Sequence, residues 1–367
     1  MFATVIVYIM AAFALLGGID RIFGSRLGFG EEFEKGILTS GQLILTMSGI
    51  MVLAPVIADV LIPVVGPLYT LIGADPAVFA GSILACDMGG EAIAAALSDN
   101  RDAVALGGMI TSSMLGVTIS FTIPAAMSMT KKEDSTFVAK GILCGILTVP
   151  IGVLFGGLIA GFDFLFILKN LIPILLLSLV IAIGILKFEN ITVKIFNIFG
   201  KLITAVAVFG LLLGVFDSLV GFKLISGIAP VSDSFVVIGN IVLMLAGAFP
   251  LMALLKKLLT KPLQSLSEKL GIDSVSTLGL LATTVNSLIV FKDIEKMDPR
   301  GKTVNMAFAV SGAFVFGDHL AFCIGVQPDM ILPMICGKLI AGAAAVAVAF
   351  LITRKDSSHR KSTEINA

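Results

Sequence analysis

The chain has 367 residues, of which 57% are hydrophobic and only 14% charged, and its mean hydropathy is +1.06. This composition excludes an ordinary soluble domain and predicts an all-α polytopic membrane protein, because apolar stretches of about 20 residues cross a bilayer as helices. The formal net charge is zero. We expect the lipid bilayer and a small molecule as partners, a homo-oligomer as an option, and no nucleic acid.

Eleven apolar segments follow one another along the chain. They run approximately from Thr4 to Ile19, Ile37 to Val65, Ala77 to Leu97, Val104 to Met127, Phe137 to Ala160, Phe164 to Leu186, Leu202 to Val220, Phe235 to Leu255, Ser276 to Phe291, Val304 to Val326 and Ile331 to Thr353. We therefore expect about 10–11 transmembrane segments. No basic region precedes the first segment, which favours a retained span over a signal peptide.

Matched residues in the two halves indicate an internal duplication. The offset drifts slowly from 197 to 199: Gly17 and Asp20 match Gly214 and Asp217, Gly73 and Asp75 match Gly271 and Asp273, and Asp99 and Arg101 match Asp298 and Arg300. We divide the chain into a first repeat (1–160), a connecting helix and loop (161–200), a second repeat (201–353) and a disordered cytoplasmic tail (354–367).

Basic loops alternate with loops that are almost free of lysine and arginine, and the pattern of the second half is the reverse of the first. This alternation is typical of an inverted repeat, in which the halves cross the membrane in opposite senses. It fails at the matched loops that carry Arg101 and Arg300. We therefore expect broken or re-entrant segments at the centre, which are tolerated where they line protein or a water-filled cavity.

The first half contains two carboxylates inside an apolar run, Asp87 and Glu91. Their spacing places both on one face of a helix, and the intervening Gly89 and Gly90 predict a break in that helix. Carboxylates at membrane depth are costly and tend to face a cavity where they bind a ligand. We interpret this stretch as part of a site for a small cation.

In the second half, the corresponding region contains Asn286 and, further on, Asp318 and His319. The scaffold is repeated but its polar residues are not, which favours a small asymmetric ligand. Asp87, Glu91 and Asp318 would bind an ammonium group, and Asn286 or His319 a neutral end. Two nearby phenylalanines, Phe121 and Phe316, would add an aromatic wall. The alternative is structural: Asp87 and Asp318 cap broken helices or pair with Arg101 or Arg300.

Other chemistries find little support in the sequence. No GxxxxGK[ST] loop is present for ATP, and neither a G-x-S-x-G nor an H-E-x-x-H motif predicts an enzyme. His319 and His359 are the only histidines, so a histidine-built metal site is not expected, and we expect no cofactor. The four cysteines lie in apolar runs without a C-x-x-C pair and predict no disulfide.

Three stretches resemble the ethanolamine utilisation transporter family (EutH): Ile19 to Ile22, Ala85 to Glu91 and Phe316 to Leu320. The resemblance covers nearly the whole chain. It implies a permease in the inner membrane of bacteria that degrade ethanolamine with a cobalamin-dependent lyase. The basic residues of the polar tail indicate that the C-terminus lies in the cytoplasm.

Ethanolamine, a small ammonium with a hydroxyl at its other end, suits the polar residues inferred above. We expect uptake of the protonated form, with Asp87 and Glu91 sharing a proton in a way that allows proton coupling. Two alternatives stay open. The substrate could be another small amine or a cation such as sodium, or the protein could be a non-transporting scaffold or receptor that docks cytosolic enzymes.

Overall fold

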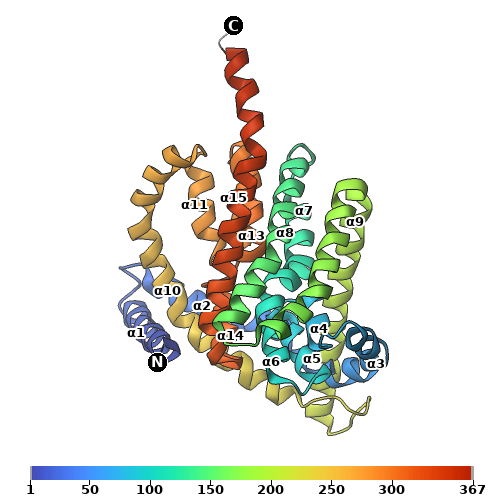
Figure 1. Ribbon diagram of the computed structural model, residues 1–367. Helices are drawn as coiled ribbons and strands as arrows, with labels where there is room; N and C mark the ends of the chain where they lie inside the picture. Colours follow the sequence, from blue (N-terminus) through green and yellow to red (C-terminus); the bar gives the residue numbers. More distant parts are fainter. Residues whose placement is uncertain (1, 365–367) are drawn as a thin grey trace.

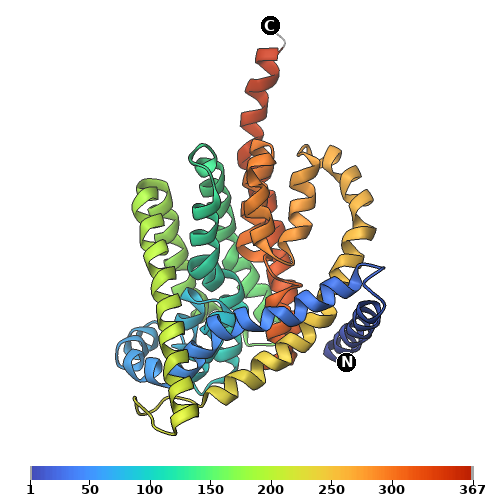
Figure 2. The ribbon, with the colours of Figure 1, turned by 180° about the vertical axis from the view of Figure 1, so that it is seen from behind.

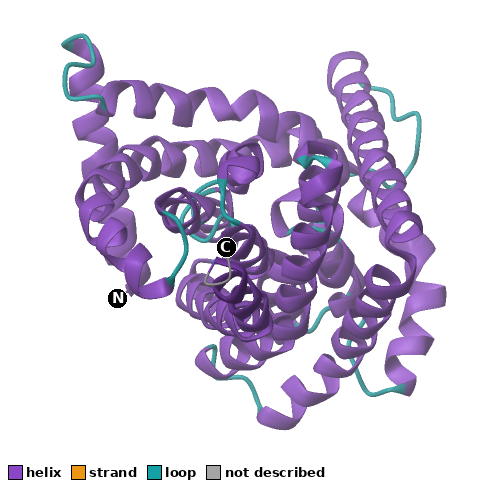
Figure 3. Cartoon of the chain, turned by 90° about the horizontal axis from the view of Figure 1, so that it is seen from above, coloured by secondary structure: helices purple, strands orange, loops and turns teal. Residues whose placement is uncertain are grey.

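The computed structural model describes residues 2–364, without the side chains of residues 2, 3, 256, 259–269 and 354–364. The described residues form helices and connecting turns, and no strand occurs among them (Figure 3). The helices are α1 (Phe2–Ile22), α2 (Phe29–Leu43), α3 (Gly49–Leu71), α4 (Ala77–Ile83), α5 (Gly90–Leu97), α6 (Arg101–Val104), α7 (Ile123–Met129), α8 (Ser135–Ile159), α9 (Phe164–Val220), α10 (Val231–Leu270), α11 (Ser274–Thr283), α12 (Ser287–Asp293), α13 (Pro299–Gly312), α14 (Asp318–Val326) and α15 (Ile331–Glu364).

Several of these helices join into longer rods through wider, π-helical turns. Ile44–Ser48 connects α2 to α3, and Ala105–Gly116 and Thr118–Thr122 connect α6 to α7. The joined α2 and α3 cross the molecule as one long oblique helix (Figure 2). π-helical turns are rare and occur often at functional sites.

Seven helical stretches of the described chain are long and apolar enough to cross a membrane, fewer than the 10–11 segments expected from sequence. One reason is α9, whose 57 residues include two of the predicted segments and a non-helical backbone at Phe188. The other reason is that three predicted segments are each a pair of short helices: α4 with α5, α11 with α12, and α13 with α14. The loop pattern predicted one such segment beside each matched loop; the described chain has one in the first half and two in the second.

The central span is the stretch Arg101–Met129. In its most apolar part 94% of the residues are buried, whereas in α1 the corresponding share is 17%. Around it, α8 packs on both α13 and α15, so the first half of the chain contacts the second in the middle of the molecule. Helices α1, α2 and α10 form a separate group at one side (Figures 1 and 2). The molecule thus has a buried centre and peripheral helices that expose apolar side chains.

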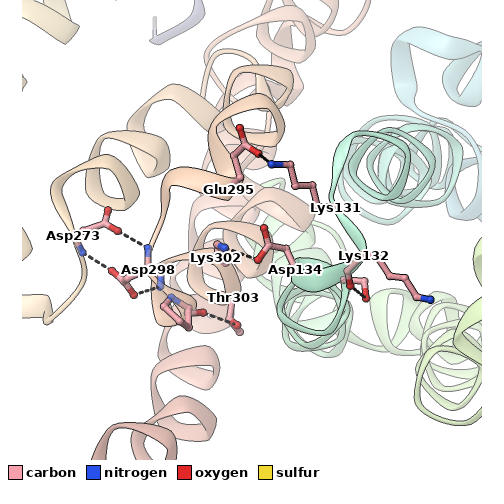
Figure 4. Close-up of polar contacts among 11 residues, drawn as sticks. Lys131, Lys132, Asp134, Asp273, Glu295, Asp298, Lys302 and Thr303 are labelled. Carbon is pink, nitrogen blue, oxygen red and sulfur yellow. Dashed lines mark hydrogen bonds and ion pairs between the residues drawn. The ribbon is translucent and has the colours of Figure 1, made fainter. Parts of the chain in front are cut away.

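Two ion pairs join the two halves at the end of the molecule shown in Figure 4, and a pair of helix caps joins α11 to α13 there. Lys131 pairs with Glu295, and the buried Asp134 pairs with the buried Lys302. Asp273 and Asp298 cap the starts of α11 and α13, and each carboxylate also accepts a hydrogen bond from the other residue's backbone N–H.

The tail predicted to be disordered begins inside α15, which continues to Glu364 and extends beyond the other helices (Figure 1). Residues 365–367 lie outside the described part of the chain. The domain boundaries and the inverted relation of the halves stay predictions.

Candidate functional site

The chain breaks between α4 and α5 in the stretch that carries Asp87. After Ile83 the backbone becomes extended, makes one 3₁₀ turn over Cys86–Met88, and passes through Gly89 with φ +94°. Glycine is required at this position because a Cβ atom would lie 1.9 Å from Cγ2 of Ile50 and because L-residues rarely adopt this φ. The break therefore follows from the local sequence.

Hydroxyl groups from the neighbouring span satisfy the backbone that this break frees. Ser112 donates a hydrogen bond to the carbonyl of Leu84, and the N–H of Ala85 donates to Oγ of Ser120 at 3.1 Å. Non-helical backbone is tolerated in a membrane only with such partners. The wide helix Arg101–Met129 thus supports the loop that presents Asp87.

Two further breaks meet in the second half. Asn286 separates α11 from α12 and caps α12 by accepting a hydrogen bond from the N–H of Leu288 at 2.9 Å. Phe314, with φ +61°, lies in the break between α13 and α14, and its N–H donates to the carbonyl of Thr283 at 3.1 Å. Because the two breaks lie side by side, Asn286 is brought close to the start of α14, which carries Asp318 and His319.

Five of the residues predicted from sequence line one cavity of about 80 Å³: Asp87, Phe121, Asn286, Asp318 and His319. This volume is several times the roughly 10–15 Å³ that one water needs on the same measure. It suits a ligand of a few non-hydrogen atoms. Residues of both halves therefore line the same cavity.

Two predicted residues do not reach this cavity. Glu91 lines a separate cavity of about 540 Å³ and accepts a hydrogen bond from Nε2 of Gln327 at 3.0 Å. Spacing of four residues aligns side chains only in a continuous helix, and the break at Gly89 turns Glu91 away from Asp87. Phe316 lines an apolar cavity with residues of α1 and α10, because the backbone turn at Phe314 directs it to the other side.

The structure adds residues that sequence reasoning missed. Phe314 takes the aromatic role expected of Phe316, with ring centroids 5.7 Å from Phe121 and 5.3 Å from His319. Helix α2 and its continuation supply Thr39, Gln42 and Thr46 to the cavity wall. No local signal marked these three, because ordinary polar residues become part of a site only through tertiary packing.

A lysine was also missed, although it carried a signal. Lys338 lies in the middle of the apolar run of α15 and is completely buried. Its Nζ donates to the carbonyl of Ser113 and lies 3.1 Å from Nδ1 of His319. An ionisable residue inside a membrane segment is a functional candidate by default, and this rule would have identified it.

The electrostatic centre of the cavity is Asp87, whose side chain is 16% exposed. Nε2 of His319 lies 3.7 Å from its Oδ1, and this oxygen is buried without a hydrogen-bond partner. Neither expected arginine pairs with Asp87: the guanidinium of Arg300 lies over the ring of Phe350 at 4.5 Å, and Arg101 lines the cavity of Glu91. Asp87 is thus a carboxylate with capacity left for a donor.

A metal ion suits this place less well. Ligand-type atoms of Cys86, Asp87 and His319 lie within 4.8 Å of one another. The ammonium of Lys338 next to His319 would repel a dication, and a metal would need several ligands beside that lysine. An ammonium needs one good carboxylate, so we assign no metal ligand here.

These features define a class: a multi-pass membrane protein with discontinuous helices around a polar central cavity, the architecture typical of secondary transporters. The family described as "Ethanolamine utilisation protein, EutH" matches residues 2–352, and the chain belongs to it. This membership confirms the resemblance seen in the sequence.

Relatives along the full length agree with this family. The chain is 47% identical to a probable ethanolamine permease EutH of Listeria monocytogenes, covering 99% of the chain and 97% of the relative. It is 39% identical to a probable ethanolamine permease EutH of Salmonella typhimurium (99% and 98% covered) and 44% identical to the uncharacterized protein YxeR of Bacillus subtilis (97% and 96% covered). No solved structure matches.

Proposed function

We propose that this protein is a permease that takes up ethanolamine in its protonated, ammonium form for ethanolamine catabolism. The observation that carries the proposal is the buried Oδ1 of Asp87, which has no hydrogen-bond partner and belongs to a residue that lines a small cavity together with Asp318 and two aromatic rings. An ammonium group would complete the hydrogen bonding of Asp87 and balance charge that is otherwise costly at this depth.

Other residues of the cavity lining suit the hydroxyl end of the substrate. Asn286, Gln42 and Thr46 offer amide and hydroxyl groups, and they belong to different parts of the chain. A ligand that bridges Asp87 and α2 would contact both the buried centre and a peripheral helix. Movement of the peripheral helices against the buried centre, with the ligand between them, would expose the site to alternate sides of the membrane.

The positions of the basic loops support a cytoplasmic C-terminus. The turn between α7 and α8, which carries Lys131 and Lys132, lies at the same end of the molecule as the end of α15 (Figure 1). The α8–α9 and α9–α10 loops, with few basic residues, lie at the other end. Lysine and arginine accumulate in cytoplasmic loops. A reporter that is active only in the cytoplasm should therefore be active when fused to the C-terminus, and a reporter that is active only outside the cytoplasm should be inactive there.

The test is uptake of radiolabelled ethanolamine into proteoliposomes at acidic pH, where the ammonium form predominates. Wild type should show saturable uptake, and Asp87→Asn should abolish it because the ammonium loses its carboxylate. Asp233→Asn, which removes an exposed carboxylate on α10, is the matched control and should transport as wild type does. Wild-type uptake no greater than in empty vesicles would refute the proposal and favour a scaffold or receptor.

Competition separates ethanolamine from other amines. Ethylamine, which keeps the ammonium but lacks the hydroxyl, should compete more weakly than ethanolamine because Asn286 and its neighbours would lose a partner. Equal competition would show a site for small amines in general. Competition by sodium alone would indicate an inorganic cation as the substrate.

A further inference from the structure

Lys338 is buried among α15, α14 and the central span, and its positive charge has no direct carboxylate partner. The ion pairs of the described side chains do not include it. Among the described side chains and backbone, the hydrogen-bond partners of its Nζ are the carbonyl of Ser113 and Nδ1 of His319. Removing an ammonium from water costs several kcal/mol unless an opposite charge compensates, so the position is a costly one to keep for packing alone.

The negative charge that compensates Lys338 lies across His319. One ring nitrogen of His319 faces Lys338 at 3.1 Å, and the other faces Oδ1 of Asp87 at 3.7 Å. The ring is 1% exposed and packs against the ring of Phe314 at an interplanar angle of 43°. The imidazole therefore stands between an ammonium and the carboxylate that would bind the substrate.

The other titratable groups near this row come from two elements. The turn between α4 and α5 contributes Cys86 together with Asp87, and α14 contributes Asp318 and Cys323. Asp318 lines the same cavity as Asp87.

We propose that Lys338 is the internal counter-cation of Asp87 and exchanges its proton for the substrate ammonium. Two cations that face one carboxylate repel each other, so arrival of the substrate favours loss of a proton from Lys338. The exchange keeps the net charge of the buried cluster equal in the empty and the loaded carrier. This inference rests on the proposed function and adds its coupling.

His319 provides the route for the proton. The ammonium of Lys338 passes a proton to Nδ1 of His319, and Nε2 of His319 gives up its own proton to water in the cavity, from which the buffer takes it. Lys338 becomes a neutral amine, His319 ends neutral with the proton on the other nitrogen, and the substrate is chemically unchanged. Release of substrate on the far side lets the reverse transfer reload Lys338 there.

One substrate cation would therefore move inward for each proton that moves outward, and the cycle would carry no net charge. This arrangement replaces the expected sharing of a proton by Asp87 and Glu91, which line different cavities.

The experiment measures ethanolamine uptake and lumen pH together in proteoliposomes with a membrane potential imposed at equal pH on both sides. Vesicles with Asp87→Asn give the background from free amine diffusion. Wild type should raise the lumen pH by one proton per substrate, and uptake should not respond to the potential. Lys338→Met should lose the pH change and become potential-driven, with accumulation of about 50-fold per 100 mV, the limit for a monovalent cation.

Lys338→Arg provides a second readout. A guanidinium keeps its proton, so this variant should fail to transport while remaining folded by size-exclusion chromatography. The wild-type measurement can refute the exchange even if both variants misfold. Potential-driven wild-type uptake without a change in lumen pH would overturn the exchange and leave the permease proposal standing, whereas no wild-type uptake would refute the permease proposal itself.

Discussion

The buried ion pair between Asp134 and Lys302 makes a sharp prediction about how the two halves are held together. Asp134 precedes α8, Lys302 lies in the first turns of α13, and their side chains are only 10% and 11% exposed (Figure 4). Asp134→Asn would leave the ammonium of Lys302 buried without its counter-charge. Breaking one side of a buried pair costs about 3–5 kcal/mol, and we expect the lower end because both residues lie at the end of the helices.

A loss of about 3 kcal/mol at roughly 2 °C per kcal/mol for a chain of this size corresponds to a fall of about 6 °C in the apparent unfolding temperature. A thiol-reactive fluorogenic dye suits the measurement, because the chain has no tryptophan and its four free cysteines are buried or half-buried. Unfolding would expose these thiols and raise the fluorescence.

Two further variants keep the reasoning falsifiable. Replacing both partners, Asp134→Leu with Lys302→Met, should restore most of the stability because no unpaired charge remains. Glu295→Gln breaks the exposed pair with Lys131, whose side chains are 44% and 66% exposed, and should lower the unfolding temperature much less. A double variant as unstable as Asp134→Asn, or an equal effect of Glu295→Gln, would refute the argument from burial.

Three other variants test the site and its frame. Glu91→Gln should leave the ethanolamine affinity near that of wild type, unlike Asp87→Asn, and a comparable loss in uptake assays would return Glu91 to the site. Gly89→Ala should destabilise the protein by at least about 2 kcal/mol in the dye assay, because of its φ and the collision with Ile50; a stable, active variant would contradict this. Burial would raise the pKa of Asp273, but hydrogen bonds from the backbone N–H groups of Ser276 and Asp298 hold this pKa below its ordinary value. The carboxylate therefore stabilises the fold at neutral pH, and this stabilisation is lost as the pH falls through the folded-state pKa. Asp273→Ala should thus lower the unfolding temperature at pH 7 and approach wild type in acid; a pH-independent difference would exclude the carboxylate as the cause.

The sequence alone predicted the class of the protein, its family and the helix break at Gly89. Hydropathy is a local property, so the apolar runs of α8 and α10 predicted membrane segments directly. The break at Gly89 was also predictable, because a glycine pair inside an apolar run conflicts with a continuous helix. Asp87, Asp318 and His319 were found as polar residues within apolar runs, and Asn286 by its match to Asp87 in the repeat. The structure places all four around one cavity.

Only the tertiary structure decided which side chains share the cavity. Glu91 and Phe316 were assigned by spacing along a regular helix, but backbone turns at Gly89 and Phe314 redirect them, and one residue with positive φ is enough to do so. Lys338 is 19 residues from His319 in sequence and 225 from Ser113, yet it contacts both. Such contacts depend on how helices from both halves pack, and no rule of local periodicity contains that information.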